Sequence, residues 1–226
     1  MNALRIASAA LLFVPAIVAA QSSAVVDEGS FTISRGGAPV GRESFRIIRA
    51  PGPGGQAFQA TGTSVLGEVK VTSRLATDSA GTPVAYISEV TERGVVVQRL
   101  RGRGRPGRFS VLAQTRTGES AREYLLDHGA LLIDEDVFNH FFFVGLAAQT
   151  RELIVISPRS AQQSTQAVQG RGEDVLDIGG RRIPARRLSL VDATGSRDVW
   201  VDDRGRLLKV AFSGNGLIAL RDDPPQ

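Results

Sequence analysis

The densest run of basic residues lies between positions 99 and 108, and arginine recurs there at every second position. Arg99, Arg101 and Arg103 share this spacing. Alternate side chains of a β-strand point to the same face of a sheet, so three guanidinium groups would line one face. Such groups bind phosphate and carboxylate through paired hydrogen bonds. The spacing predicts an anion-binding surface; the alternative is a solvated face that acidic residues of neighbouring strands neutralise.

A run of aromatic residues near the middle of the chain forms a second candidate site. Phe138, Phe141 and Phe142 would lie on one face of a helix, and neighbouring apolar residues extend that face almost all round. Acidic residues precede the run, as they do at helix starts. We interpret residues 134–148 as a buried helix, with a buried strand as the alternative. Its phenylalanines would either fill the concave face of a sheet or line a cavity for an apolar ligand.

Neither histidine completes a recognisable metal or catalytic site. Asp136 and His140 would share a helix face, but no third strong ligand lies near them in the sequence. We predict no metal site and expect His140 to be hydrogen-bonded in the interior. The chain lacks the Gly-x-Ser-x-Gly turn of many hydrolases, and it has no cysteine for thiol catalysis. We assign no catalytic residue; a hydrolase that pairs His128 or His140 with a Ser or Asp stays an alternative.

Residues 102–107 match the Gly-x-Gly-x-x-Gly pattern of dinucleotide-binding loops. That function requires a helix to begin directly after a parallel strand. Pro106 and Gly107, followed by the alternating Phe109 and Val111, indicate a hairpin instead. We therefore predict no cofactor.

The elements that must position these residues alternate with a period of two. Phe31 and Ile33 alternate with polar residues, for example, and glycine or proline turns recur at roughly the 8–12-residue spacing typical of all-β folds. This pattern predicts a mainly β fold of about 13 strands in an antiparallel meander. Because so wide a sheet must curl or close, we predict a half-barrel or barrel-like sheet wrapped around the central apolar helix.

The two ends of the 226-residue chain are expected to lie outside this domain. Residues 1–20 have one early arginine, a short apolar core and small residues before Gln21, which indicates a secretory signal peptide. We expect residues 21–28 to be flexible, residues 29–221 to form a single β-rich domain and residues 222–226 to fray. No later segment is apolar enough to span a membrane. The protein is therefore expected to be exported, either to the periplasm or to the medium.

Composition narrows the classes of protein further. With 42% hydrophobic residues and no cysteine, the chain is neither disordered nor held together by disulfides. All but two of its 27 basic residues are arginine, which codon bias explains most simply. The net charge of +4 is modest, and export argues against nucleic acid as a partner. The sequence does not indicate an oligomeric state.

Three motifs resemble those of exported bacterial β-rich domains of unknown function. They are an opening hairpin (Phe31, Ile33, Gly37, Pro39 and Gly41), a central helix after an acidic patch (Asp134–Ala148), and a Trp-Val-Asp-x-x-Gly-Arg-Leu-Leu hairpin (Trp200–Leu208) before a last strand that ends at Arg221. The chain also looks distantly similar to the half-barrel carriers that shuttle lipoproteins across the periplasm. The resemblance implies a curved sheet and export rather than a specific activity.

These observations together predict a binding protein rather than an enzyme. The first hypothesis is an exported, soluble carrier of an apolar or amphipathic, lipid-like ligand, with Phe138, Phe141 and Phe142 as its apolar wall. Arg99, Arg101 and Arg103 would bind the headgroup if they lie at the rim. The alternative is a structural or interaction module of the cell envelope that binds proteins through a sheet edge such as Gln162–Gln169. A cavity of several hundred Å³ would favour the carrier, and a packed interior would favour the module.

Overall fold

The computed structural model describes residues 23–52, 55–126, 129–193 and 195–226. The predicted signal peptide and His128 lie outside these ranges. Within them the chain forms one mainly β sheet of fifteen strands, against the roughly 13 that turn spacing predicts. No described helix is long and apolar enough to cross a membrane.

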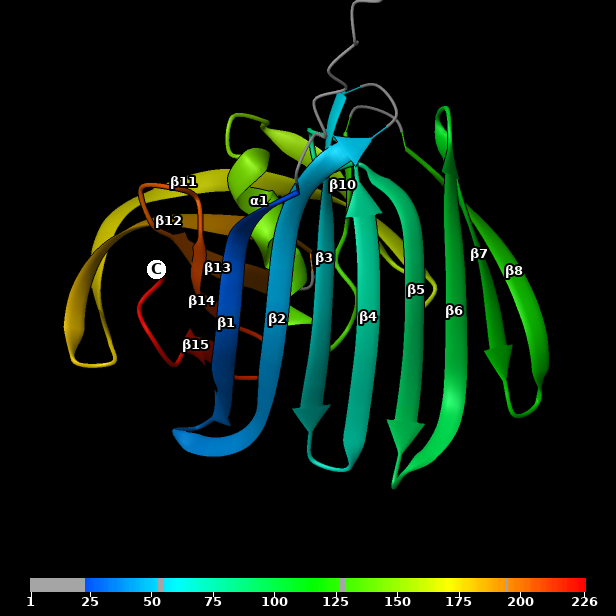
Figure 1. Ribbon diagram of the computed structural model, residues 1–226, viewed down its shortest axis with the longest axis horizontal. Coiled ribbons are helices and arrows are strands. Elements are labelled where there is room, and N and C mark those ends of the chain that lie inside the picture. Colours follow the sequence, from blue (N-terminus) through cyan, green and yellow to red (C-terminus); the bar gives the residue numbers. More distant parts are fainter. Residues whose placement is uncertain (1–22, 53–54, 127–128, 194) are drawn as a thin grey trace, which may run out of the picture.

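The first half of the sheet is a simple meander in which each strand pairs antiparallel with the next. Figure 1 shows it as a curved wall running from blue to green. Its strands are β1 (Ala24–Arg35), β2 (Ala38–Gly52), β3 (Gly55–Leu66), β4 (Val69–Thr77), β5 (Pro83–Glu92), β6 (Val95–Arg105), β7 (Arg108–Thr115) and β8 (Gly118–Leu125).

The second half continues from the opposite side of β1, because the last strand pairs with the first. The order across the sheet is β8-β7-β6-β5-β4-β3-β2-β1-β15-β14-β13-β12-β11-β10-β9. All neighbours are antiparallel except β9 and β10. The strands are β9 (Ala130–Leu132), β10 (Glu152–Ser157), β11 (Gln162–Ile178), β12 (Arg181–Asp192), β13 (Gly195–Val201), β14 (Leu207–Phe212) and β15 (Leu217–Arg221).

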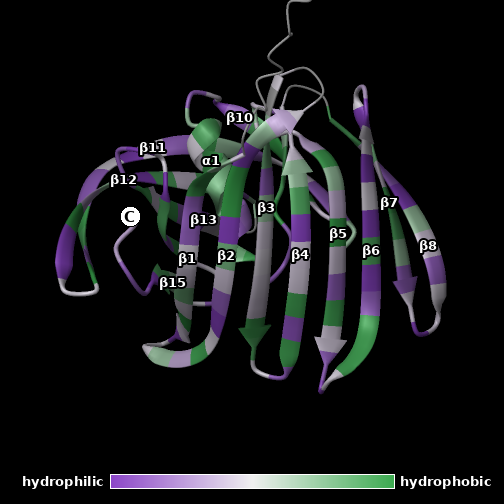
Figure 2. Ribbon diagram, viewed as in Figure 1, coloured by the Kyte–Doolittle hydropathy of each residue, from purple (hydrophilic) through white to green (hydrophobic). Residues whose placement is uncertain are grey.

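The alternation of apolar and polar residues gives the sheet an inner and an outer face. In β1, for example, Phe31 and Ile33 are fully buried, whereas Thr32 between them is exposed. Figure 2 shows the same alternation as bands along the front strands. The inward residues of both halves join into one large apolar core, which is how a single sheet without disulfides can enclose its interior.

A short helical segment fills the space that the sheet encloses. It consists of the 3₁₀ turn η1 (Phe138–Phe141) followed by the α-helix α1 (Phe142–Leu146), and we call residues 138–146 the plug. The predicted helix over residues 134–148 is therefore too long. The acidic residues before it also do not cap it, since no side chain of its own start bonds its first N–H groups.

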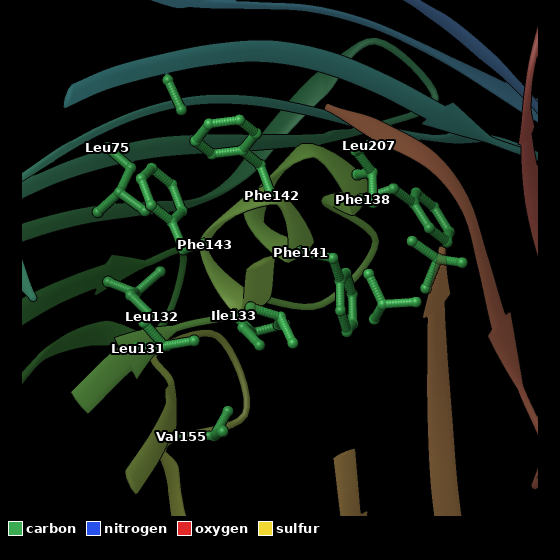
Figure 3. Close-up of a cluster of buried hydrophobic side chains, with 14 of the residues drawn as sticks. Leu75, Leu131, Leu132, Ile133, Phe138, Phe141, Phe142, Phe143, Val155 and Leu207 are labelled. Atoms are coloured by element: carbon green, nitrogen blue, oxygen red, sulfur yellow. The ribbon is translucent and has the colours of Figure 1, made fainter. Parts of the chain in front are cut away.

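The plug packs against both walls of the sheet. The ring of Phe142 lies 5.9 Å from that of Phe58 on β3, and the ring of Phe141 lies 5.6 Å from that of Phe212 on β14. Figure 3 shows these side chains diverging, with Phe142 and Phe143 to one side and Phe138 and Phe141 to the other. A helix this short has little stability alone, so these contacts determine its place.

The two ends of the domain are held together by a buried ion pair. The Arg221 guanidinium donates to Asp27 Oδ1 at 2.7 Å and to the carbonyl of Leu207 at 3.1 Å, and both charged side chains are almost fully buried. Asp27 lies within residues 21–28, which we expected to be flexible; the strand instead begins at Ala24. The prediction that residues 222–226 fray is also wrong for Asp222, which accepts hydrogen bonds from Ser30 and Thr32.

Two of the sequence motifs form the turns of β-hairpins. The Gly-x-Gly-x-x-Gly segment forms the β6–β7 hairpin, as predicted, and a Cβ at Gly102 would lie 2.5 Å from the ring of Phe109. In the Trp200–Leu208 motif, Asp202 Oδ1 accepts from the backbone N–H groups of Arg204 and Arg206 and closes the β13–β14 turn.

The segment predicted as an exposed edge strand lies inside the sheet. Gln162–Gln169 is the first part of β11, which pairs with β10 on one side and with β12 on the other. Gly170 and Gly172 would be expected to end a strand after Gln169. The chain instead continues through a bulge between Gly170 and Glu173.

The packing of the plug predicts a large effect for Phe141→Ala. Phe141 is only 2% exposed, so its truncation should leave a cavity and lower the free energy of unfolding by about 3–5 kcal/mol. Leu146→Ala, also in the plug but 40% exposed, is the matched control and should cost less than about 1 kcal/mol. Urea melts of the three proteins measure both values. A loss below about 1.5 kcal/mol for Phe141→Ala would indicate an open space beside this ring.

Candidate functional site

The structure places the two predicted groups of ligand-binding residues on opposite sides of the sheet. Arg99, Arg101 and Arg103 lie on the exposed outer face of β6, and the phenylalanines of the plug lie in the core. The guanidinium of Arg99 donates to Glu89 Oε2 at 2.8 Å, as the solvated-face interpretation of this run anticipates. The arginines therefore do not form a charged rim around Phe138, Phe141 and Phe142.

The interior beside the plug has little free volume. The pocket that touches Phe138 and Phe141 has a volume of about 70 Å³, and its wall includes Asp134, Arg197 and Phe212. Ligand sites for small molecules usually have volumes of about 300–1,000 Å³. By the criterion set out from the sequence, the described interior is packed.

A buried carboxylate holds the beginning of the plug. Glu43, on the inner face of β2, accepts hydrogen bonds from the backbone N–H groups of Phe138 at 2.6 Å and Asn139 at 2.7 Å. It also accepts from Nδ2 of Asn139 at 2.8 Å. The first N–H groups of a helical turn have no partner within the turn, so this carboxylate supplies what the local sequence does not.

A glycine on the neighbouring strand makes room for this contact. Gly62 on β3 faces Asn139, and a Cβ at this position would lie 2.2 Å from Asn139 Nδ2. Asn139 Oδ1 is buried and has no hydrogen-bond partner in the described part of the chain. The side chain is therefore oriented by its amide nitrogen toward Glu43 rather than by its oxygen.

A second polar group lies next to the first. The Tyr86 hydroxyl donates to Asp134 Oδ2 at 2.6 Å, and Asp134 Oδ1 accepts from the backbone N–H of Arg159 at 2.9 Å. His140 Nδ1 accepts from the backbone N–H of Asp134 at 3.2 Å, as expected for a hydrogen-bonded histidine of the interior. Its ring also meets that of Tyr86 edge to face, with 5.7 Å between centroids.

Burial determines the charge states of these groups. Loss of hydration raises the pKa of Glu43 to about 7, against the lowering effect of its three N–H donors. It raises the pKa of Asp134 to about 6 and lowers the pKa of His140 to about 3, so the imidazole is neutral at pH 7.

These polar residues are of types that occur in active sites, but they are not accessible from the surface. Glu43, Asn139 and His140 are 0% exposed and Asp134 is 3% exposed, so a substrate does not reach them in this arrangement. Among the described residues, no three potential metal-ligating side chains come together. We conclude that the buried cluster positions the plug.

The outer face of the first half carries a larger, open hollow of about 600 Å³. It spans strands β2 to β5, where small side chains on β3 and β4 lie between longer ones. The outward-facing residues that line it are Ser44, Arg46, Thr61, Thr63, Thr72, Arg74, Ile87 and Glu89. We call this region the outer hollow.

Sequence reasoning missed the main residues of both regions. The sequence does carry a signal for Glu43. It is a charged residue at an inward position of an alternating strand, on the same face as buried Phe45 and Ile47. Arg46 and Arg74 had none, since each is one arginine among many and only the pairing of β2 to β5 brings them to one surface.

The raised pKa of Glu43 predicts a pH-dependent effect of Glu43→Gln. The folded protein holds the Glu43 proton more tightly than the unfolded chain, so the stability it contributes is complete below pH 4.5 and decreases as pH rises through about 7. This decrease corresponds to roughly 3 kcal/mol. The glutamine variant lacks it, so its destabilisation relative to wild type should be larger at pH 5 than at pH 8.

Urea melts of both proteins at the two pH values measure this difference. Asp134 contributes in the same direction and His140 in the opposite one, but both occur in both proteins and cancel in the comparison. The exposed Glu92→Gln is the control and should shift little at either pH. Equal destabilisation by Glu43→Gln at pH 5 and pH 8 would contradict the raised pKa.

No family model matches the chain, and no curated protein matches it. Among solved structures it is similar to a β-barrel-like protein of a domain of unknown function, DUF1849, from Brucella abortus. That alignment has a TM-score of 0.49 and 7% sequence identity, and it covers 86% of this chain and 94% of that one. The resemblance to lipoprotein carriers stays a prediction from the sequence.

Proposed function

We propose that the protein is an exported, non-enzymatic binding module that takes an anionic, hydroxyl-rich ligand in the outer hollow. The observation that carries the proposal is that two exposed arginines flank the open hollow of the outer face, while the interior beside the plug is packed. The apolar run of residues 1–20 supports export, and amino-terminal sequencing that begins at Gln21 would verify it.

The chemistry of the outer hollow supports an anionic ligand. Arg46 and Arg74 flank it, and both side chains are exposed. Glu28 lies 3.5 Å from Arg46, but no described acidic side chain lies within ion-pair distance of Arg74. A guanidinium group in this position is free to bind a carboxylate, sulfate or phosphate in two-point fashion.

The floor of the outer hollow supports a ligand with hydroxyl groups. The Ser44 and Thr63 hydroxyls make no hydrogen bond within the described part of the chain, so they are available to a ligand. Ile87, which is 56% exposed, adds an apolar surface beside them. Hydroxyls, one apolar side chain and flanking arginines together suit a saccharide that carries acidic groups.

A carrier of an apolar ligand is the second candidate. The observation in its favour is the aromatic lining that Phe138, Phe141, Phe142 and Phe143 would provide if the plug moved out of the sheet. A ligand would then have to replace both the ring contacts and the three hydrogen bonds to Glu43.

Binding measurements with two probes distinguish these functions. For dextran sulfate at low salt, the double variant Arg46→Gln/Arg74→Gln should weaken binding about tenfold or more, and added salt should weaken wild-type binding. The control is Arg35→Gln/Arg204→Gln, which removes the same charge from exposed positions elsewhere and should retain most of the affinity.

Equal weakening by the two double variants would mean that the protein responds only to net charge. A fluorescent fatty acid should not bind the wild-type protein. Saturable binding of this probe that Phe141→Ala alters would favour the carrier instead.

A further inference from the structure

The arginines of the outer hollow belong to a row that crosses the strands. Arg46 on β2 pairs in register with Thr61 on β3, and Thr61 pairs with Arg74 on β4. Arg74 in turn pairs with Ile87 on β5, which pairs with Arg101 on β6. Arg46, Arg74 and Arg101 therefore occupy alternate strands of one cross-strand line, which we call the arginine row.

The arginine row has a regular spacing. Neighbouring strands lie about 4.8 Å apart, so its arginines repeat at about 10 Å across the sheet. An uncharged residue, Thr61 or Ile87, separates each arginine from the next. A row perpendicular to the strands presents an evenly spaced line of positive charge rather than a single binding point.

The charges of the arginine row are largely unneutralised. Among the described residues, Arg74 and Arg101 have no acidic side chain within ion-pair distance, and Arg46 has only the exposed Glu28 at 3.5 Å. The neighbouring line differs, because Arg99 there is paired with Glu89. Exposed ion pairs contribute little to folding stability, and exposed arginines without a partner contribute no more. The stability of the fold therefore does not require the arginine row.

We propose that the arginine row binds an acidic polysaccharide lying across the strands, with an acidic group on alternate sugars. This inference rests on the proposed function and specifies its ligand. Each carboxylate would meet one arginine, and the intervening sugar would lie against Ile87 or Thr61. A monosaccharide would engage only one of the three positions.

The shape of this face disfavours two other polyanions. This face is the outside of the curved wall in Figure 1 and is hollowed between β2 and β5, so a flat membrane surface would leave the hollow unfilled. Phosphates follow one another at about 3.4 Å of rise per strand in duplex nucleic acid, several to each arginine of the row. Vesicles and nucleic acid are therefore competing outcomes in the test.

A charge-swap variant tests the row itself. Ala76 lies two residues from Arg74 on the same outer face of β4, so Arg74→Ala combined with Ala76→Arg moves one guanidinium out of line without changing net charge. The probe is a hyaluronate oligosaccharide, which carries a carboxylate on every second sugar and is long enough to reach all three arginines. Titration calorimetry on the full exported protein measures its affinity.

We expect the wild type to bind this oligosaccharide and the swap variant to bind it about tenfold more weakly or worse. Arg101→Gln should weaken it similarly, whereas Arg204→Gln, at an exposed turn, should not. Glucuronate at equal carboxylate concentration should not compete. Because Arg101→Gln alters a single exposed side chain, it keeps the test decisive if the swap variant does not fold.

Three results would overturn the inference. The swap variant could bind as tightly as the wild type, glucuronate could compete as well as the oligosaccharide, or phosphatidylglycerol vesicles or single-stranded DNA could bind more tightly with the same dependence on Arg74. If hyaluronate fails while dextran sulfate still requires Arg46 and Arg74, the inference fails and the proposed function stands. If neither probe depends on these arginines, both fail.

Discussion

The contact between Glu43 and the start of the plug is the interaction on which the interior of the protein depends. Three N–H donors of Phe138 and Asn139 would otherwise be buried without an acceptor, at a cost of about 1–3 kcal/mol each. A turn of nine residues does not hold its own position. By anchoring it to β2, the carboxylate directs Phe142 toward Phe58 and Phe141 toward Phe212, so both walls of the sheet share one core.

The topology limits the freedom of the plug. Strands β9 and β10 are parallel, and a parallel pair needs a crossover connection, which here is the chain that carries the plug. Pairing at both of its ends keeps this chain close to the sheet. The pairing of β1 with β15, fixed by Arg221 and Asp27, closes the other side of the interior by joining the first strand to the last. The plug is thus a part of the core rather than a lid.

The sequence allowed the fold to be predicted more fully than the site. Period-two alternation and regular turns indicate a curled antiparallel sheet around a central apolar segment, because both signals are local. The lengths of β11 and of the plug were not predictable in this way. A bulge carries the strand through Gly170, and the helix start is capped by Glu43, 95 residues from Phe138 in the chain. Arg46, Arg74 and Arg101 likewise become one row only through four strand pairings.

The two faces of strands β2 to β5 differ in what their side chains leave free. The inward apolar side chains of strands β2 to β5 are packed in the core, and inward Glu43 and Tyr86 are hydrogen-bonded within the buried cluster. Removing the plug would expose the core and leave Glu43, with its raised pKa, in an apolar wall. The outer face of strands β2 to β5 has no such constraint, because the outward side chains that line the hollow are exposed or half-buried. The short side chains of Thr61 and Thr63 leave the outer hollow between longer neighbours, and arginines on alternate strands give it a positive charge. Substitutions on that face would not disturb the interior, which is why we propose binding there.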